Sequence, residues 1–274
     1  MKILNISGYK FVPIEDPNLI QAQLRARCEA LGIKGTILLA KEGTNIALAG
    51  TEPSIRQFIR QLNEDEHFSD LIFKESWSEK IPFRRLRVRV KDEIIMMRVP
   101  SVDPLKKTGK YIAPKELKAW LDENRDVVVL DTRNDYEIKV GTFENAIDFN
   151  VENFREFPGK LYEVADAIKD KPVVMFCTGG IRCEKATAVA LDCGFKNVYQ
   201  LDGGIIKYFE DCGGAHWKGE CFVFDDRVAI APNLQPSDKH YCLECLEELT
   251  EEDLKSPMFQ YNKSCPHCCK DAAA

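Results

Sequence analysis

The feature that most constrains the fold is an apolar run that leads into a cysteine and a glycine-containing loop. Residues 172–176 read PVVMF, the loop covers residues 177–182, and residues 183–193 have helical spacing before Gly194. A short, continuous apolar run is typical of a strand buried in a parallel sheet. Ligands of such sheets bind beyond the carboxyl ends of the strands. The loop 177–182 is therefore a candidate functional site.

The same alternation of strands and helices extends over residues 113–215. We expect helices at 114–123, 153–169, 183–193 and 203–210, and strands at 127–130, 146–149, 172–176 and 198–201. Strands that alternate with helices predict an α/β domain whose parallel sheet is covered by helices on both faces.

Residues 1–95 have a different order of elements. We expect strands at 2–12, 34–40, 46–49 and 71–77, and helices at 17–31 and 51–63. This βαββαβ order predicts a ferredoxin-like domain. Residues 96–112, which are rich in proline and lysine, are the predicted linker, and residues 216–274 form a cysteine-rich C-terminal region.

Length and composition agree with an α/β multidomain protein. The chain has 274 residues, of which 45% are hydrophobic and 30% are charged, as in globular proteins of two or three domains. No run approaches the ~18 apolar residues of a membrane-spanning helix, and the N-terminus lacks the apolar stretch of a signal peptide. We expect a cytoplasmic protein that does not bind membranes. The 11 cysteines are then expected as thiols or metal ligands rather than disulfides.

Positive charge is concentrated in one segment of a chain whose net charge is −6. Residues 83–89 alternate apolar residues with arginine, so a strand there has one apolar and one basic face. Such a stripe is a candidate contact surface for a polyanion such as RNA, and a merely solvated strand face is the alternative. The candidate RNA-binding residues are Arg84, Arg85, Arg87, Arg89, Lys106 and Lys107, with Lys110 as a weaker candidate.

Cys177, the first residue of the loop, is the candidate nucleophile. The two loop glycines can turn backbone N–H groups inward as an anion nest, and Arg182 adds positive charge beside a helix start. A thiol in this setting ionises easily, and the thiolate is the nucleophilic form. The alternative is an inert, buried cysteine. The nest residues are Thr178, Gly179, Gly180 and Ile181.

The spacing within the loop separates two chemistries. Cysteine-dependent phosphatases place their arginine six positions after the cysteine, whereas here that position is Cys183. The shorter loop closes around a smaller atom, such as sulfur or selenium. Cys183 itself is either a packing residue or a resolving thiol that traps an oxidised or persulfidated Cys177 as a disulfide.

Four cysteines near the C-terminus give the strongest spacing signal in the chain. Cys242-x2-Cys245 and Cys265-x2-Cys268 are two pairs of the kind that hold a tetrahedral structural Zn²⁺. The glutamate-rich segment between the pairs can hardly form a core, so a metal would supply the missing stability. Spare ligand candidates are His240, His267, Cys269, Cys212, His216 and Cys221.

The loop from Cys177 to Arg182 resembles the active loop of rhodanese-type sulfurtransferases. Two further segments resemble the same domain, namely Asp131-Thr132-Arg133 at a strand end and the turn at residues 201–204. Asp131 and Arg133 therefore join the candidate catalytic residues. The Gly-His segment usual in that domain is replaced here by residues 141–143, GTF.

Nearly the whole chain resembles the rhodanese-domain family of bacterial tRNA uridine hydroxylases, the UPF0176 family. The segments that carry the resemblance are 41–46 (KEGTNI), 82–88 (PFRRLRV), 177–185 (CTGGIRCEK) and 222–227 (FVFDDR). The resemblance implies an acylphosphatase-like N-terminal domain, a central rhodanese domain and a cysteine-rich tail. It also implies hydroxylation of the tRNA wobble uridine at C5, with molecular oxygen as co-substrate and a persulfide on Cys177 as intermediate.

The residues alone lead only to a nucleophilic thiolate beside a basic patch. The sequence has no flavin or nicotinamide fingerprint, and its histidines form no evident two-histidine, one-carboxylate iron set. Two alternatives to hydroxylation therefore stay open. One is a persulfide sulfurtransferase that acts on RNA or a small acceptor, and the other is a non-catalytic, zinc-stabilised RNA-binding adaptor.

Overall fold

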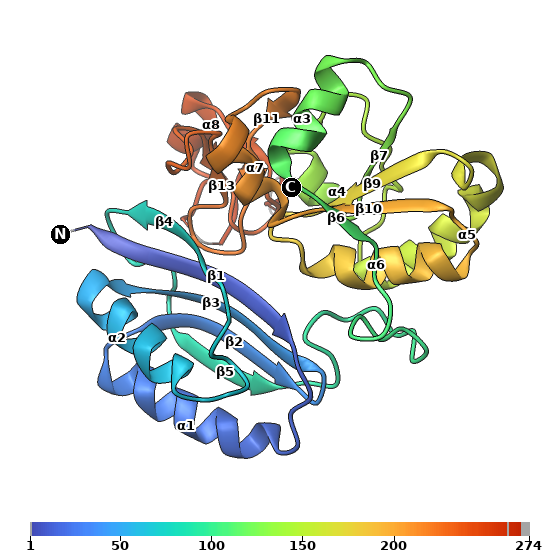
Figure 1. Cartoon of the computed structure of the whole chain (residues 1–274). Coiled ribbons are helices and arrows are strands. Elements are labelled where there is room, and N and C mark those ends of the chain that lie inside the picture. Colours follow the sequence, from blue (N-terminus) through green and yellow to red (C-terminus); the bar gives the residue numbers. More distant parts are fainter. Residues whose placement is uncertain (1, 262, 270–274) are drawn as a thin grey trace.

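The computed structural model describes residues 2–261 and 263–269. It contains two main sheets that lie side by side, one mostly antiparallel and one parallel (Figure 1). The first sheet consists of β1 (Ile3–Phe11), β2 (Lys34–Ala40), β3 (Gly43–Thr51), β4 (Lys74–Ser78) and β5 (Leu86–Val90). The strand order is β4-β1-β3-β2-β5. The first four strands pair antiparallel, which confirms the ferredoxin-like arrangement, and β5 adds the basic strand in parallel at the edge beside β2.

Helices α1 (Pro17–Ala30) and α2 (Glu52–Asn63) cover one face of this sheet. The side chains of Asp16 and Thr51 accept hydrogen bonds from the first free N–H groups of these helices, as their positions in the sequence predict. Alternate strand residues pack beneath the helices, and the core includes Leu4, Ile37, Ile46, Phe58 and Val88. The other face of the sheet, from which Tyr9 projects, points toward the second half of the molecule.

The second sheet is parallel and has the order β6-β10-β9-β7. Its strands are β6 (Lys110–Ile112), β7 (Val128–Asp131), β9 (Pro172–Phe176) and β10 (Asn197–Leu201). Its helical elements are α3 (Pro114–Asp122), α4 (Asp135–Ile138), η1 (Phe154–Glu156), α5 (Phe157–Ile168), α6 (Ile181–Asp192) and α7 (Gly204–Cys212). Helices α5 and α6 pack in the apolar cluster on one face, and α3 and α7 in the cluster on the other. The predicted α/β class is thus confirmed.

The predicted strand at 146–149 is wrong, because that segment makes only a single bridge, between Ile147 and Leu130. The strand lies earlier, as β8 (Gly141–Phe143), and pairs with β11 (Trp217–Gly219). The physical reason is the Phe143 ring, which packs edge-on against Tyr208 and Trp217 and draws β8 into the core. Helix α6 also begins two residues earlier than predicted, so Arg182 belongs to its first turn.

Smaller elements complete the C-terminal region. They are β12 (Cys221–Phe222), β13 (Ala229–Ile230), β14 (His240–Tyr241), β15 (Glu248–Leu249) and α8 (Glu251–Lys255). Trp217, Cys221 and Ile230 share an apolar cluster with α3 and α7, so the chain beyond α7 packs directly on the parallel sheet. Among the described residues, no helix is both long and apolar enough to cross a membrane.

Candidate active site

Cys177 follows directly on β9, and its side chain has no exposed surface. The Gly180 N–H donates a hydrogen bond to Cys177 Sγ at 3.1 Å. Gly180 precedes α6 with φ 103°, a left-handed conformation that favours glycine. Gly204, at the start of α7, packs against the backbone of the loop. A Cβ on Gly204 would lie 2.4 Å from the Cys177 carbonyl oxygen, so this position has room only for glycine.

The surroundings of Cys177 favour its thiolate. Burial alone would raise the pKa of this thiol, but a hydrogen bond with Cys183, the Arg182 guanidinium and the N–H groups of Arg182 and Gly180 outweigh burial. Together they lower the pKa of Cys177 to about 5. The arrangement can therefore present a nucleophilic sulfur at neutral pH.

Cys183, in the first turn of α6, is fully buried and lies close enough to Cys177 to influence its pKa. Burial, and then the neighbouring Cys177 thiolate, hold the pKa of Cys183 well above its ordinary value. Thr132 Oγ1 lies 3.7 Å from Cys183 Sγ on its other side. The structure thus brings two thiols together, one that ionises easily and one that keeps its proton.

Arg182 is oriented by a residue that the sequence did not single out, Glu137 of α4. Arg182 Nη2 donates to Glu137 Oε1 at 2.8 Å, and both side chains are buried. Thr178 Oγ1 lies 3.4 Å from the same carboxylate. Glu137 also closes a capping box with Asn134, and this Asn-x-x-Glu spacing was the available sequence signal. That signal predicts a helix start, but not a partner for Arg182.

Asp131 and Arg133 form a second buried ion pair beneath the loop. Arg133 Nη2 donates to Asp131 Oδ2 at 2.7 Å, and neither side chain has exposed surface. Arg133 also donates to the Gly141 carbonyl at 2.6 Å, and Thr142 Oγ1 donates to Asp131 at 2.8 Å. These hydrogen bonds tie the end of β7 to β8. We expect a positioning role for them rather than contact with substrate.

Glu184 joins the two halves of the molecule directly above the loop. Its carboxylate accepts hydrogen bonds from Tyr9 Oη of β1 at 3.0 Å and from Tyr111 Oη of β6 at 2.7 Å. Thr108 Oγ1 and Gln200 Nε2 donate to its other oxygen at 3.1 and 3.2 Å. The Tyr9 hydroxyl lies so close to the loop that a Cβ on Gly180 would come within 2.9 Å of it. The N-terminal domain therefore forms part of the surroundings of the Cys177 loop.

Lys185 makes a second connection between the halves. Its ammonium, almost fully buried, donates to Glu93 at 2.7 Å and forms an ion pair with Glu42 at 2.8 Å. It also donates to the Ile95 carbonyl at 3.1 Å. Two carboxylates and a carbonyl satisfy this buried charge, so the contact fixes the domains relative to each other.

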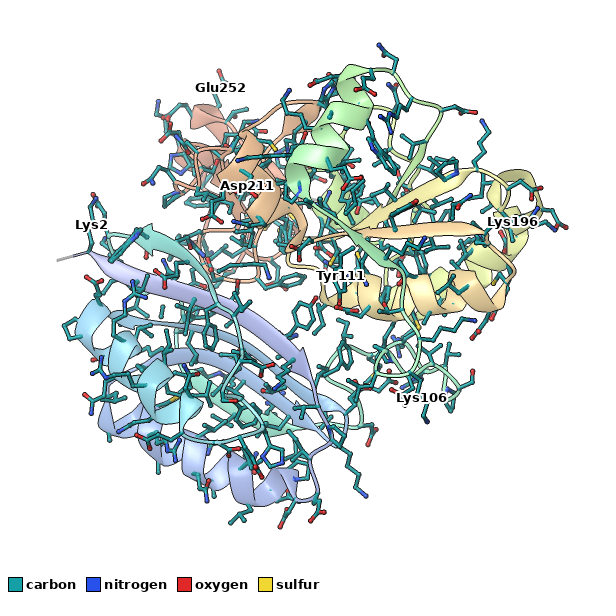
Figure 2. The ribbon with its side chains drawn as sticks, viewed as in Figure 1. Lys2, Lys106, Tyr111, Lys196, Asp211 and Glu252 are labelled. Carbon is teal, nitrogen blue, oxygen red and sulfur yellow. The ribbon has the colours of Figure 1, made fainter. Side chains whose placement is uncertain are left out.

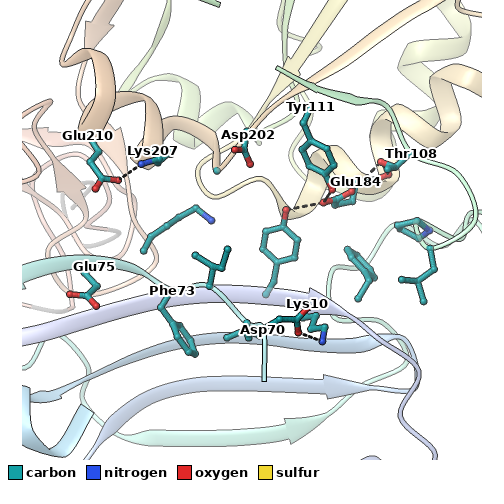
Figure 3. Close-up of a pocket in the computed structure, with 18 of the residues that line it drawn as sticks. Lys10, Asp70, Phe73, Glu75, Thr108, Tyr111, Glu184, Asp202, Lys207 and Glu210 are labelled. Atoms are coloured by element: carbon teal, nitrogen blue, oxygen red, sulfur yellow. Dashed lines mark hydrogen bonds and ion pairs between the residues drawn. The ribbon is translucent and has the colours of Figure 1, made fainter. Parts of the chain in front are cut away.

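A cavity of about 770 Å³ lies between the halves, beside this Glu184 network (Figure 3). Its walls come from β1, the segment 70–75, the segment 104–111 and the start of α7. Tyr111, which is 57% exposed, points into the space between the halves (Figure 2). The volume lies within the range of small-ligand sites. Cys177 does not line the cavity, because Tyr9 stands between the cavity and the loop.

The candidate RNA-binding residues are all exposed, but they differ in their partners. Arg84 pairs with Asp226 at 3.6 Å, Lys106 with Asp103 at 3.1 Å and Lys107 with Asp192 at 2.6 Å. Within the described residues, no ion pair involves Arg85, Arg87 or Arg89. The alternation along β5 agrees with the sequence pattern, since Val88 is in the core and Arg87 and Arg89 are exposed.

The four candidate metal ligands of the tail lie together. The Sγ atoms of Cys242 and Cys268 are 3.8 Å apart, those of Cys245 and Cys265 3.6 Å, and those of Cys265 and Cys268 3.7 Å. Sulfurs placed about 2.3 Å from a tetrahedral Zn²⁺ are separated by about 3.8 Å. The cluster could therefore hold a metal ion. The spare ligand candidates His240, His267, Cys269, Cys212, His216 and Cys221 lie outside this cluster of described residues.

Comparison with known proteins agrees with this architecture. Residues 3–94 match the UPF0176 acylphosphatase like domain, and residues 113–211 match the rhodanese-like domain. The fold and the loop thus define a rhodanese-domain protein with an acylphosphatase-like N-terminal domain.

Curated relatives identify the family within this class of proteins. The chain is 48% identical over 281 aligned residues to a tRNA uridine(34) hydroxylase of Cupriavidus necator, with 100% of both chains covered. It is 46% identical over 283 aligned residues to a protein of the same name from Paraburkholderia xenovorans, with 100% of this chain and 99% of the relative covered. The chain belongs to the tRNA uridine(34) hydroxylase family.

Proposed function

We propose that this chain hydroxylates the wobble uridine of tRNA at C5, with Cys177 as the active cysteine. The observation that carries the proposal is full-length similarity to relatives named for this activity, in a chain that keeps an intact, thiolate-favouring loop. Because tRNA is the substrate, the reaction takes place in the cytoplasm.

The overall reaction requires two electrons. One atom of molecular oxygen enters the C5–H bond and the other leaves as water, so two electrons and two protons come from a thiol-class reductant, which leaves as a disulfide. During turnover the Cys177 thiolate attacks the outer sulfur of a persulfide-class donor, the donor leaves as its thiolate, and Cys177 then carries the persulfide. The added S–S bond moves the reactive sulfur about 2 Å beyond the buried Sγ. Cys183 is proposed as the resolving thiol; it must first lose its proton, because the thiolate is the attacking form.

Comparison of tRNA nucleosides from cells with and without the gene tests this function. We expect loss of 5-hydroxyuridine derivatives at the wobble position. Loss of a thionucleoside instead would identify an RNA sulfurtransferase, and an unchanged set of nucleosides would favour an adaptor.

The ionisation of Cys177 should be visible in a pH titration. Its folded-state pKa is lowered, so the thiolate is present above about pH 5 and is lost as the pH falls through that value. An ordinary cysteine ionises near ~8.5. The measurement is thiolate ultraviolet absorbance, taken as the difference between wild type and Cys177→Ser, in which the other thiols cancel. A midpoint near the ordinary value would show that the loop does not activate this thiol.

Arg87 and Arg89 of β5, together with Arg85 just before that strand, are proposed to bind tRNA phosphates. The triple variant Arg85→Ala, Arg87→Ala, Arg89→Ala should weaken tRNA binding and reduce its salt dependence, by about 0.9 in the log–log slope per lost phosphate contact. Fluorescence anisotropy over a salt series measures both. A charge-matched control changes Lys160, Lys169 and Lys196 to alanine, and Lys196 lies far from β5 (Figure 2). Equal slopes for the two triple variants would mean that the β5 arginines are only solvated.

The four-cysteine cluster is proposed to bind one structural Zn²⁺. Protein purified without chelator should contain about one equivalent of zinc, and Cys265→Ser should lose it. Cys212→Ser, at a half-buried thiol outside the cluster, should keep it. A closed set of four thiolates leaves no position for substrate, so metal loss should affect the stability of the tail more than turnover. Metal analysis showing less than half an equivalent, with the thiols freely reactive or paired as disulfides, would exclude the zinc site.

A further inference from the structure

The inner part of the cavity contains a lysine with no partner. Lys74 of β4 is half-buried, and its ammonium makes no hydrogen bond or ion pair with any residue that the structure describes. The ammonium lies 5.6 Å from the centre of the Tyr9 ring. Its Cε is 3.4 Å from the position that a Cβ on Gly203 would take. Lys74 therefore lies next to the turn that supports the Cys177 loop.

Asp202 provides an acceptor on the facing wall. It is the first residue after β10, is exposed to the cavity, and its carboxylate has no partner within residues 2–261 and 263–269. Lys207, which is labelled in Figure 3, is already paired with Glu210 at 3.1 Å and Asp211 at 3.2 Å. The cavity thus presents one free donor group and one free acceptor group.

The charges around Lys74 and Asp202 decide what kind of ligand group can bind between these two side chains. Burial lowers the pKa of the Lys74 ammonium. Three negative charges oppose this effect, namely those of the Cys177 thiolate, Asp202 and Glu184. A phosphate placed here would meet these three negative groups, against Lys74 and a Lys207 that is already paired with Glu210 and Asp211. A neutral ring with a carbonyl for Lys74 and an N–H for Asp202 meets no such repulsion. An ammonium only donates and an ionised carboxylate only accepts.

Uracil carries this pair of groups on neighbouring atoms, a carbonyl at C4 and an N–H at N3. Cytosine presents the reverse, an amino group at C4 and an acceptor at N3, so it would place donor against donor and acceptor against acceptor. The exposed Tyr111 ring, which also lines the cavity, offers a surface on which a base can stack.

We propose that the interdomain cavity is the site of the target uracil, and that Lys74 and Asp202 select uracil over cytosine by contacting O4 and N3–H. This inference rests on the proposed function and names the groups that recognise its substrate. It also assigns a role to the N-terminal domain, because Lys74 comes from β4.

The sheet register supports the same placement of the RNA. Direct strand partners connect Arg87 to Thr36, Ala47, Ser7 and finally Lys74 in one row across the sheet. Directly paired residues point to the same face, so Arg87 and Lys74 share the face opposite α1 and α2. Four strand spacings span about 19 Å. A phosphate backbone on β5 can therefore extend toward a base in the cavity.

The test compares anticodon stem-loop RNAs that differ only in U or C at the wobble position. Fluorescence anisotropy at one fixed salt concentration should show wild type binding the U form at least about tenfold more tightly. Lys74→Met and Asp202→Asn should each reduce this ratio to less than about threefold. Lys207→Met, the same substitution at a paired lysine of the same cavity, should keep the wild-type ratio.

A chemical change in the RNA tests the same contact with wild-type protein, so the result does not depend on how the variants fold. An N3-methylated uridine lacks the donor for Asp202, so wild type should bind it more weakly than uridine, while Asp202→Ala, which has no acceptor, should bind both alike. Equal affinity of wild type for the U and C forms would overturn the inference, even if the same preparation hydroxylates the wobble uridine. A clear preference for U without any 5-hydroxyuridine formed would instead contradict the proposed function and leave this inference standing.

Discussion

Replacing Cys177 by serine is expected to lower turnover on tRNA at least about a thousandfold while the protein still folds. The expected loss is large because the loop acts on a sulfur. Its N–H groups, Arg182 and Cys183 all stabilise a thiolate, and together they lower the pKa of Cys177 to about 5. A serine hydroxyl in the same place stays protonated and cannot carry a persulfide. The measurement is the rate of 5-hydroxyuridine formation, with circular dichroism as the check on folding.

The control for this variant is Cys193→Ser. Cys193 is a half-buried thiol just beyond α6, and burial raises its pKa. Its loss removes a thiol from the same helix region without touching the loop, and turnover should stay close to that of wild type. If the Cys177 variant retained more than a few per cent of the activity, Cys177 would not be the active cysteine.

Removing the charge of Glu137 is expected to cause the largest loss of stability. In Glu137→Gln the Arg182 guanidinium stays buried without its carboxylate, and breaking a buried pair in this way costs about 3–5 kcal/mol. That is a large part of the total stability of a typical domain. Denaturant unfolding of the full chain measures the loss. Turnover should also fall at temperatures where the variant is folded, because Arg182 loses the group that holds it against the Cys177 loop.

Glu163→Gln is the matched control. Glu163 pairs with Lys160 at 3.1 Å, but its side chain is 64% exposed, so the same substitution should leave the unfolding midpoint nearly unchanged. Similar destabilisation by the two substitutions would show that the buried Glu137–Arg182 pair contributes no more to the free energy of unfolding than an exposed ion pair.

Local patterns in the sequence were enough to predict the strand–loop–helix around Cys177. The apolar run, the two glycines and the helix cap each act over a few residues, so a linear reading detects them. The four tail cysteines were equally visible, because two Cys-x2-Cys pairs carry their geometry in their spacing. The alternation of arginine with apolar residues in β5 likewise needs only the two-residue period of a strand.

The residues that sequence reasoning missed act across long distances in the chain. Tyr9 reaches the loop, and Lys74 reaches the neighbouring turn at Gly203, only because the first sheet turns its helix-free face toward the second domain. No local pattern in β1 or β4 carries that information. Strand β8 was missed for a similar reason, since its pairing with β11 depends on the packing of Phe143 against Trp217. Tertiary contacts of this kind override short-range preference.

The most direct test of the central claim uses purified protein, unmodified tRNA, a thiol reductant, a persulfide donor and isotopically labelled dioxygen. Mass spectrometry of the wobble nucleoside then shows which atom was added and where it came from. We predict labelled 5-hydroxyuridine with wild type and none with Cys177→Ser. A thionucleoside at that position, or 5-hydroxyuridine formed equally well by the Cys177 variant, would contradict the account.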